Sequence, residues 1–306
     1  MYLGIDTSNY TTSLALYDGE NIVQCKQLLD VKQGECGLRQ SNAVFSHTVN
    51  LPNLFCELKP NIHKLSAVGV SVRPRNVDGS YMPCFLVGEN VAAAIGACSD
   101  IPVYKTSHQV GHILAALYSI DKLDLINQKF IAFHVSGGTT EALLVTPDSK
   151  EIIKAEIIAQ SLDLKAGQAV DRVGVMLGMK FPCGKELDEL SQKSDKKFKI
   201  KPSMKELNCS MSGIENKCKK MISDGEKDED TAKFCIEYIL AALDEMTTRI
   251  IKKYGNLPLV FAGGVMSNSL ISNKLSAKYS AFFAKREFSC DNAAGAAIQS
   301  YLKDKK

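Results

Sequence analysis

Two histidines four residues apart have the spacing in this chain that most directly suggests chemistry. His108 and His112 lie in the run TSHQVGHILAAL, residues 106–117. A helix advances about 3.6 residues per turn, so this spacing places both imidazoles on one face, where their nitrogens can hold a single metal ion. Two ordinary histidines in one helix would show the same spacing. The pair alone therefore leaves a metal site and a purely structural helix open.

Two glycine turns offer a second kind of chemistry, the binding of phosphate. Residues 135–140 read VSGGTT, in which glycines let backbone amides approach a phosphate and hydroxyls can donate to its oxygens. Residues 261–268 read FAGGVMSN and stand between an apolar strand and a helix, a context that suits a nucleotide. A plain hairpin also favours glycines, so the first turn is only moderately specific. Together the turns predict a nucleotide between them.

Composition limits the class of protein. With 306 residues, 45% of them hydrophobic and 23% charged, the chain can bury a large core and form two lobes. We expect a cytoplasmic protein without membrane contact, because no apolar run approaches about 20 residues and the N-terminus lacks a basic region. The ten cysteines form no Cys-x-x-Cys pair and are expected to be reduced. The net charge of +3 permits an RNA partner without indicating one.

An internal sequence repeat indicates duplication. Residues 2–17 (YLGIDTSNYTTSLALY) and 130–145 (FIAFHVSGGTTEALLV) share a strand, a small polar turn and a second strand, with Ser136 matching Ser8. Apolar periodicity adds strands and helices after each hairpin. The expected strands lie at 22–29, 67–72, 103–104, 152–158, 257–262 and 281–284, and the expected helices at 42–57, 85–97, 169–177, 231–254 and 293–302, with the histidine helix and another from 268. This pattern predicts two α/β lobes of similar plan.

In their order along the chain, these motifs resemble the tRNA threonylcarbamoyladenosine transferases, enzymes once described as O-sialoglycoprotein endopeptidases. The resemblance covers nearly the whole chain. It rests on LGIDTS at 3–8, the two histidines, VSGGT at 135–139, GQAVDR at 167–172, PCG at 182–184, SMSG at 210–213, AGGV at 262–265 with Asn268, and CDNA at 290–293.

The resemblance implies an α/β fold, the two-lobed actin-like ATPase fold of actin, sugar kinases and Hsp70, with duplicated lobes and a nucleotide and metal cleft between them. The first lobe would span residues 1–125 and include the histidine helix. The second would span 126–306, with a helical insertion at about 185–255 and a C-terminal helix packing back toward the first lobe.

The resemblance also implies the site. One divalent metal, iron or zinc, would be held by His108, His112 and Asp291, a set that leaves coordination positions open. Asp6 and Asp171 are the candidate catalytic carboxylates, and Asp171 best fits a hydrogen-bond acceptor for ribose or substrate. The adenylate nucleotide, threonylcarbamoyl-AMP or ATP, would contact the following residues: His134, Val135, Ser136, Gly137, Gly138, Asp171, Gly184 and Asn268.

In the family reaction, the amine of a tRNA adenosine at position 37 attacks the carbamoyl carbonyl of threonylcarbamoyl-adenylate, and AMP leaves. The metal would orient the acyl group and polarise its oxygen. The implied partners are tRNA, threonylcarbamoyl-adenylate, a partner subunit of similar fold and the small ATPase of the bacterial modification complex.

Three segments depart from the family pattern. Relatives have Cys-Asp-Glu-Thr where this chain has NYTT from Asn9 to Thr12, and a Gly-Pro-Gly loop where it has RPRNVDGS from Arg73 to Ser80. The family's Ser-Gly-Leu-Lys ends here in Glu215, whose charge would oppose an RNA backbone. His134 replaces an apolar residue, and a core histidine and a nucleotide contact are equally consistent with it.

Two alternatives to the transferase function remain. The departures suggest a divergent, short paralogue that transfers a carbamoyl-type group to a small molecule or acts as a nucleotide- and metal-binding subunit. A metallopeptidase would need a glutamate after its first histidine, and Gln109 cannot serve as that base. Six lysines between Lys193 and Lys205 are consistent with an RNA contact or simply with a solvated face.

Overall fold

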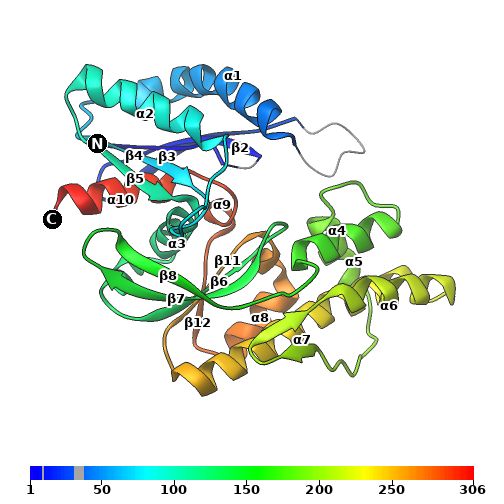
Figure 1. Ribbon diagram of the computed structural model, residues 1–306. Helices are drawn as coiled ribbons and strands as arrows, with labels where there is room; N and C mark the ends of the chain where they lie inside the picture. Colours follow the sequence, from blue (N-terminus) through cyan, green and yellow to red (C-terminus); the bar gives the residue numbers. More distant parts are fainter. Residues whose placement is uncertain (9, 31–37) are drawn as a thin grey trace. The chain divides into compact units, whose positions relative to one another are not determined.

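The computed structural model describes residues 1–8, 10–30 and 38–306, and its course is drawn in Figure 1. Asn9, one of the departures from the family pattern, lies outside the described residues. Internal contacts divide the chain into two compact units. Unit 1 contains residues 1–127, 146–155 and 290–306, and unit 2 contains residues 128–145 and 156–289. The lobe limits expected from the sequence, at residues 125 and 126, stay a prediction.

Unit 1 is built on a five-stranded mixed sheet in the order β3-β2-β1-β4-β5. Strand β1 pairs antiparallel with β2 and parallel with β4. The strands span β1 Tyr2–Asp6, β2 Thr11–Tyr17, β3 Ile22–Leu28, β4 Ala67–Arg73 and β5 Val103–Ser107. All residues of β1 and β2 are buried, as expected for strands covered on both faces.

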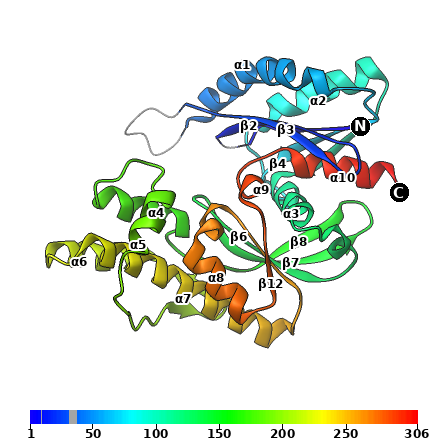
Figure 2. The same ribbon diagram turned by 180° about the vertical axis from the view of Figure 1, so that it is seen from behind.

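Helices cover both faces of this sheet. Helices α1 (Gln40–Leu58) and α2 (Phe85–Ser99) lie on one face, and α3 (His108–Ser119) and α10 (Ala294–Asp304) lie on the other (Figures 1 and 2). Two short 3₁₀ turns, η1 (Lys59–Asn61) and η2 (Leu123–Asn127), also belong to this unit.

Helix α10 is seated on the sheet through glycines that permit close approach. A Cβ atom added to Gly4 of β1 would lie 2.2 Å from the carbonyl oxygen of Ala293, and one on Gly69 of β4 would lie 2.0 Å from that of Ala296. A Cβ on Gly295 would lie 1.8 Å from the carbonyl oxygen of Gly111 in α3. Because any side chain would collide there, these glycines fix α10 against β1, β4 and the histidine helix.

The sheet of unit 2 repeats this topology. Its order is β12-β11-β6-β7-β8, with β6 antiparallel to β7 and parallel to β11. The strands span β6 Phe130–Val135, β7 Thr140–Asp148, β8 Ile152–Gln160, β11 Leu259–Ala262 and β12 Ala281–Phe283. In each sheet the first two strands in the chain form a hairpin, and the third strand pairs with the second. The last two strands lie parallel to the first strand, on its other side. The duplication predicted from residues 2–17 and 130–145 is confirmed.

The core of unit 2 forms where its long helix packs on this sheet. Buried residues of α7 (Asp228–Tyr254), such as Ile239 and Leu243, join Phe133 of β6 and Phe261 of β11 in one apolar cluster. The rings of Phe133 and Phe261 stack with centroids 4.4 Å apart. The other elements are α4 Ala166–Met176, α5 Gly184–Ser191, β9 Ser203–Lys205, β10 Asn208–Ser210, α6 Ser212–Ser223, η3 Gly264–Ser267, α8 Ser269–Lys278 and α9 Arg286–Ser289.

Most expected elements are present. The main difference lies in residues 178–230, where apolar periodicity predicts no regular element, although the resemblance implies a helical insertion at about 185–255. This region holds α5, the β9–β10 hairpin and α6. Helix α6 fully buries only Ile214, Cys218 and Met221, spaced by four and three residues, and most of its other residues are polar or charged. Such a narrow apolar stripe is hard to recognise in a charged segment. None of the helices in the described residues is both long and apolar enough to cross a bilayer.

Candidate functional site

The histidine helix begins where β5 ends. Ser107 caps α3, and its hydroxyl accepts a hydrogen bond from the backbone N–H of Val110 at 3.3 Å. The backbone N–H of Gln109 donates to the carbonyl of Pro74 at 3.0 Å, which ties the helix to the loop after β4. His108 is therefore the first residue of α3, and His112 follows one turn later on the same face.

Asp291 reaches the histidines from the other end of the chain. It lies in the short link between α9 and α10, which Asn292 holds in shape. The Asn292 side chain accepts from the backbone N–H of Ala294 at 3.0 Å and donates to the carbonyl of Cys290 at 2.7 Å. The contact of Gly295 with Gly111 brings the start of α10 against α3. This contact places the Asp291 carboxylate beside both imidazoles.

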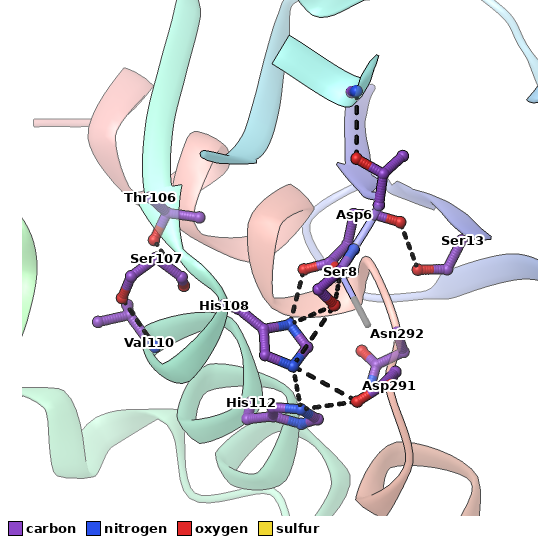
Figure 3. A network of polar contacts seen from close by, with 12 residues as sticks. Asp6, Ser8, Ser13, Thr106, Ser107, His108, Val110, His112, Asp291 and Asn292 are labelled. Carbon is purple, nitrogen blue, oxygen red and sulfur yellow. Dashed lines mark hydrogen bonds and ion pairs between the residues drawn. The ribbon is translucent and has the colours of Figure 1, made fainter. Parts of the chain in front are cut away.

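Three ligand atoms converge in this part of unit 1, as Figure 3 shows. Nε2 of His112 lies 2.9 Å from Nε2 of His108, and Oδ1 of Asp291 lies 3.4 Å and 3.3 Å from those two nitrogens. Ligands bound about 2.1 Å from one ion stand about 3.0–3.4 Å from each other in octahedral or tetrahedral geometry. The donor set therefore fits a single divalent ion such as iron or zinc, and the three side chains are mostly buried.

A second layer of contacts orients His108. Its Nδ1 lies 2.9 Å from Oδ2 of Asp6, the last residue of β1, and 2.9 Å from the hydroxyl of Ser8. The Ser8 hydroxyl and backbone N–H both donate to Oδ1 of Asp6. With Nδ1 donating to the carboxylate, Nε2 is the nitrogen directed at His112 and Asp291 and is the one that a bound metal ion would deprotonate, the arrangement common to metal-binding histidines.

The charges around His108 favour a cation. Burial alone would lower the pKa of His108, but the carboxylates of Asp6 and Asp291 outweigh it and raise that pKa to about 10. Burial would likewise raise the pKa values of both carboxyl groups, and the neighbouring histidines hold them below the usual range. Two carboxylates flanking one imidazole thus make a site of negative potential, which attracts a proton or a metal ion.

The first glycine turn of unit 2 is held by its own side chains. The Ser136 hydroxyl accepts from the backbone N–H groups of Gly138 and Thr139, at 3.3 and 3.2 Å, and the hydroxyl of Thr139 contacts Nδ1 of His134 at 3.2 Å. Two of the backbone amides that were expected to bind a phosphate therefore donate hydrogen bonds within the turn. Val135 is fully buried, so its side chain belongs to the core and does not face a ligand.

The other nucleotide candidates gather around this turn. Gly263, at the second glycine turn, has φ +103°, and a Cβ there would lie 2.3 Å from the carbonyl oxygen of Val135. A Cβ on Gly167, in the first turn of α4, would lie 2.6 Å from the backbone nitrogen of Gly137. The two glycine turns and α4 are therefore direct neighbours, and Asp171 follows Gly167 by one helical turn.

Asp171 links α4 to the start of α5. Its Oδ1 accepts from the backbone N–H of Cys183 at 2.9 Å, directly before Gly184. Burial raises the pKa of Asp171 above its ordinary value, although the Cys183 N–H partly offsets this. Asn268 caps α8 by accepting from the N–H of Ile271 at 3.1 Å, and its neighbour Ser269 donates to Asp188 of α5. These contacts bring all the nucleotide candidates together within unit 2.

Sequence reasoning missed the role of two groups. Asp6 was expected to be a catalytic candidate without its contact to His108, and no role was expected for Ser8. The run Asp6-Thr-Ser8 at the end of a buried strand was the available signal. The departure at Glu215 is also explained in part, because its carboxylate pairs with Arg172 at 2.7 Å and lies 3.9 Å from Lys219. Its charge is therefore compensated locally.

Comparison with known proteins identifies relatives along almost the whole chain. Residues 43–298 match the model of a family described as tRNA N6-adenosine threonylcarbamoyltransferase. A protein of that name from Thermosipho africanus is 31% identical, over 99% of this chain and 94% of its own length. Another from Thermotoga neapolitana is 30% identical over 99% and 94%, and one from Francisella philomiragia is 29% identical over 97% and 92%.

Solved structures show the fold. Component A of (R)-2-hydroxyglutaryl-CoA dehydratase from Acidaminococcus fermentans has a TM-score of 0.59 at 17% identity and covers 100% of this chain and 99% of its own. The ROK hexokinase of Thermus thermophilus has a TM-score of 0.56 at 13% identity, with 99% of both chains covered. HypF of T. kodakarensis has a TM-score of 0.63 at 10% identity, over 99% of this chain and 47% of its own. The expected actin-like ATPase fold is confirmed.

Proposed function

Because the chain belongs to the tRNA N6-adenosine threonylcarbamoyltransferase family, we propose that it transfers a threonylcarbamoyl group from threonylcarbamoyl-adenylate to N6 of a tRNA adenosine, position 37 in the family. The family consists of transferases, which makes this chain an acyltransferase by membership. The observation that carries the proposal is the convergence of His108, His112 and Asp291 in a chain with this family match. We place the reaction in the cytoplasm.

In the proposed reaction, a nitrogen–carbon bond forms between the adenosine amine and the carbamoyl carbon. The bond from that carbon to the phosphate oxygen breaks, AMP leaves with the electron pair, and the amine loses a proton. A divalent metal bound at His108, His112 and Asp291 would supply a Lewis acid. Asp6 orients His108, so we assign it a positioning role in place of the catalytic role considered from the sequence.

The nucleotide would be held by unit 2. In our proposal, His134 and the turn from Val135 to Gly138 contact the phosphate. The contact is made by groups of the turn other than the backbone amides that already donate to the Ser136 hydroxyl. Oδ1 of Asp171 is already engaged by Cys183, which leaves Oδ2 as an acceptor for a ribose hydroxyl. Gly184 and Asn268 flank this position, because α5 is joined to α4 through Asp171 and to α8 through Ser269.

The direct test supplies the metal-loaded protein with unmodified tRNA, the adenylate-forming synthase, threonine, bicarbonate and ATP. Nucleosides from the digested tRNA are then analysed by mass spectrometry. The proposed partner subunit of similar fold and the small ATPase are added in a parallel reaction. We expect threonylcarbamoyladenosine in at least one of the two reactions. Its absence from both, with metal and nucleotide bound, would contradict the proposed function.

The loop from Arg73 to Ser80 favours a second candidate, transfer of a carbamoyl-type group to a small molecule. Its Arg73 side chain donates to Asn76 at 3.0 Å, and its Pro74 carbonyl accepts from Gln109 beside His108. Two arginines near the histidine helix suit a small anionic acceptor. In the same assay, release of AMP without modification of tRNA, dependent on an added small carboxylate or phosphate acceptor, would favour this candidate.

A further inference from the structure

The positive charge of the chain is concentrated in one short segment of unit 2. Residues 193–205 contain six lysines and one aspartate, a net charge of +5. The whole chain carries +3, so the remaining residues together carry −2. The small overall charge is therefore the sum of a basic segment and a slightly acidic remainder. This uneven charge distribution is expected of a protein with a polyanion-binding patch.

Within this segment the side chains alternate between solvent and core. Lys197, Lys199 and Lys201 are exposed, whereas Phe198 and Ile200 between them pack against the main apolar cluster of unit 2. An alternation with period two is typical of an extended chain, in which successive outward side chains lie on one face. The three ammonium groups are therefore presented together, over a span of about 13 Å between the first and the last.

The segment is fastened to α7 near both ends. At its start, Ser194 donates to Asp230 at 2.5 Å and its carbonyl accepts from Lys233 at 2.6 Å. Near its end, the backbone N–H of Ser203 donates to the hydroxyl of Tyr238 at 3.4 Å. The ring of Phe198 meets that of Phe234 edge-on, with centroids 5.3 Å apart. A segment held in this way loses little conformational entropy when a ligand binds.

Its lysines are available to a partner, with one exception. Lys196 pairs with Glu226 and lies 3.8 Å from Asp230, so it serves the attachment to α7. Within the described residues, no ion pair engages Lys193, Lys197, Lys199, Lys201 or Lys205. Because Phe198 is committed to the core, the segment offers no aromatic face for stacking bases. It can contact phosphates and not bases.

We propose that the exposed lysines of residues 193–205 bind the phosphate backbone of the tRNA substrate, independently of its sequence. The proposal rests on the proposed function for the identity of the RNA. The three ammonium groups, presented over about 13 Å, can each contact one phosphate of an RNA strand. This surface would contribute binding affinity and would position the tRNA, whereas other residues would select the adenosine that is modified.

The test compares the metal-loaded full chain with the triple variant Lys197→Ala, Lys199→Ala, Lys201→Ala, using fluorescence anisotropy with labelled tRNA at several salt concentrations. Each lost phosphate contact lowers the slope of log K against log salt by about 0.7–0.9, so the slope should fall by about 2–3. Between 50 and 200 mM salt, the wild-type affinity should therefore fall about 20–40-fold more than that of the variant.

A matched control removes three exposed lysines elsewhere in unit 2, as Lys252→Ala, Lys253→Ala, Lys274→Ala. This variant changes the net charge equally, and we expect it to keep most of the wild-type slope. Equal slopes for the wild type and the Lys197, Lys199 and Lys201 variant would overturn the proposal, and so would an equal loss in the control variant. Thermal unfolding of both variants checks that neither effect comes from misfolding.

The outcome is independent of the activity assay. If the wild type modifies tRNA but the segment variant binds tRNA as well as the wild type does, the surface is wrong and the function stands. If no modified adenosine is formed but the segment variant loses salt-dependent binding, the function fails and the surface stands. Retained tRNA binding together with lost binding of the similar-fold partner subunit would assign the segment to a protein contact and overturn the RNA proposal.

Discussion

Oδ2 of Asp6 lies 2.9 Å from Nδ1 of His108 and thereby determines which nitrogen of that imidazole faces His112 and Asp291. The two residues are 102 positions apart in the chain and belong to β1 and α3 of the same unit. The contact converts a pair of histidines in a helix into an oriented donor set.

Replacing Asp6 by Asn should weaken metal binding without removing a ligand. The amide no longer imposes a single orientation and protonation state on His108, and loss of such a supporting group typically reduces metal affinity about 10–100-fold. Competition with a chromogenic chelator measures this affinity, and the visible spectrum of the cobalt-loaded protein reports the ligand geometry. Asp30→Asn, at an exposed carboxylate of the same unit, is the control. Unchanged affinity and spectrum in Asp6→Asn would exclude the positioning role.

Replacing His112 by Ala should abolish stable metal binding, because two ligands from this site do not hold a divalent ion as three do. Elemental analysis of the purified variant should find less than about a tenth of the wild-type metal, on the order of the loss expected for a ligand. His63→Ala, an exposed histidine of the same unit, should retain the metal. Full metal content in His112→Ala would show that the ligand assignment is wrong.

Replacing Gly295 by Ala should destabilise unit 1 and displace Asp291. The new Cβ would lie 1.8 Å from the carbonyl oxygen of Gly111, so α10 must move away from α3. We expect a loss of about 1–3 kcal/mol in the free energy of unfolding and a fall in metal content. Gly213→Ala is a matched control, since it is also the second residue of a helix and its Cβ would meet only the Tyr238 hydroxyl, at 3.8 Å. Equal stability of the two variants would contradict the close-packing argument.

Replacing Asp163 by Asn should make the stability of unit 2 less dependent on pH. Asp163 accepts from the N–H groups of Leu164 and Met211, each at 2.7 Å, and from the Ser212 hydroxyl at 2.6 Å. Burial alone would raise its pKa, but these hydrogen bonds outweigh it and hold the pKa below the ordinary value. The carboxylate therefore stabilises the fold above about pH 4, and this contribution is lost as the pH falls through the lowered pKa.

Urea unfolding at pH 7 should show the Asp163→Asn variant less stable than the wild type by about 1 kcal/mol, as for the loss of a helix-capping side chain. The difference should disappear at low pH, once the pH has fallen through the lowered pKa and the wild-type carboxyl group is also protonated. Asp195→Asn, at an exposed position, serves as the control and should not differ from the wild type at either pH. A difference for Asp163→Asn that persists at low pH would show that the charge is not the cause.

Much of the fold could be predicted because local patterns determine it. The apolar runs at Tyr2–Asp6 and Phe130–Val135, each followed by a polar turn and a second run, led to the correct duplicated topology. The segment around α6 could not be predicted in this way, because three buried residues among many lysines give almost no periodic signal. There the helix is stabilised by packing on α7 and α4, which a local pattern does not contain.

The sequence by itself determined the hairpins of both units, the spacing of His108 and His112, and, through resemblance, the assignment of Asp291 to them. Only the tertiary structure decided that Asp6 and Ser8 orient His108, that Gly111 and Gly295 bring α10 onto the histidine helix, and that the lysines of residues 193–205 face outward together. The physical reason is that spacing fixes neighbours on one element, whereas contacts over a hundred residues or more depend on how glycines and buried faces allow separate elements to pack.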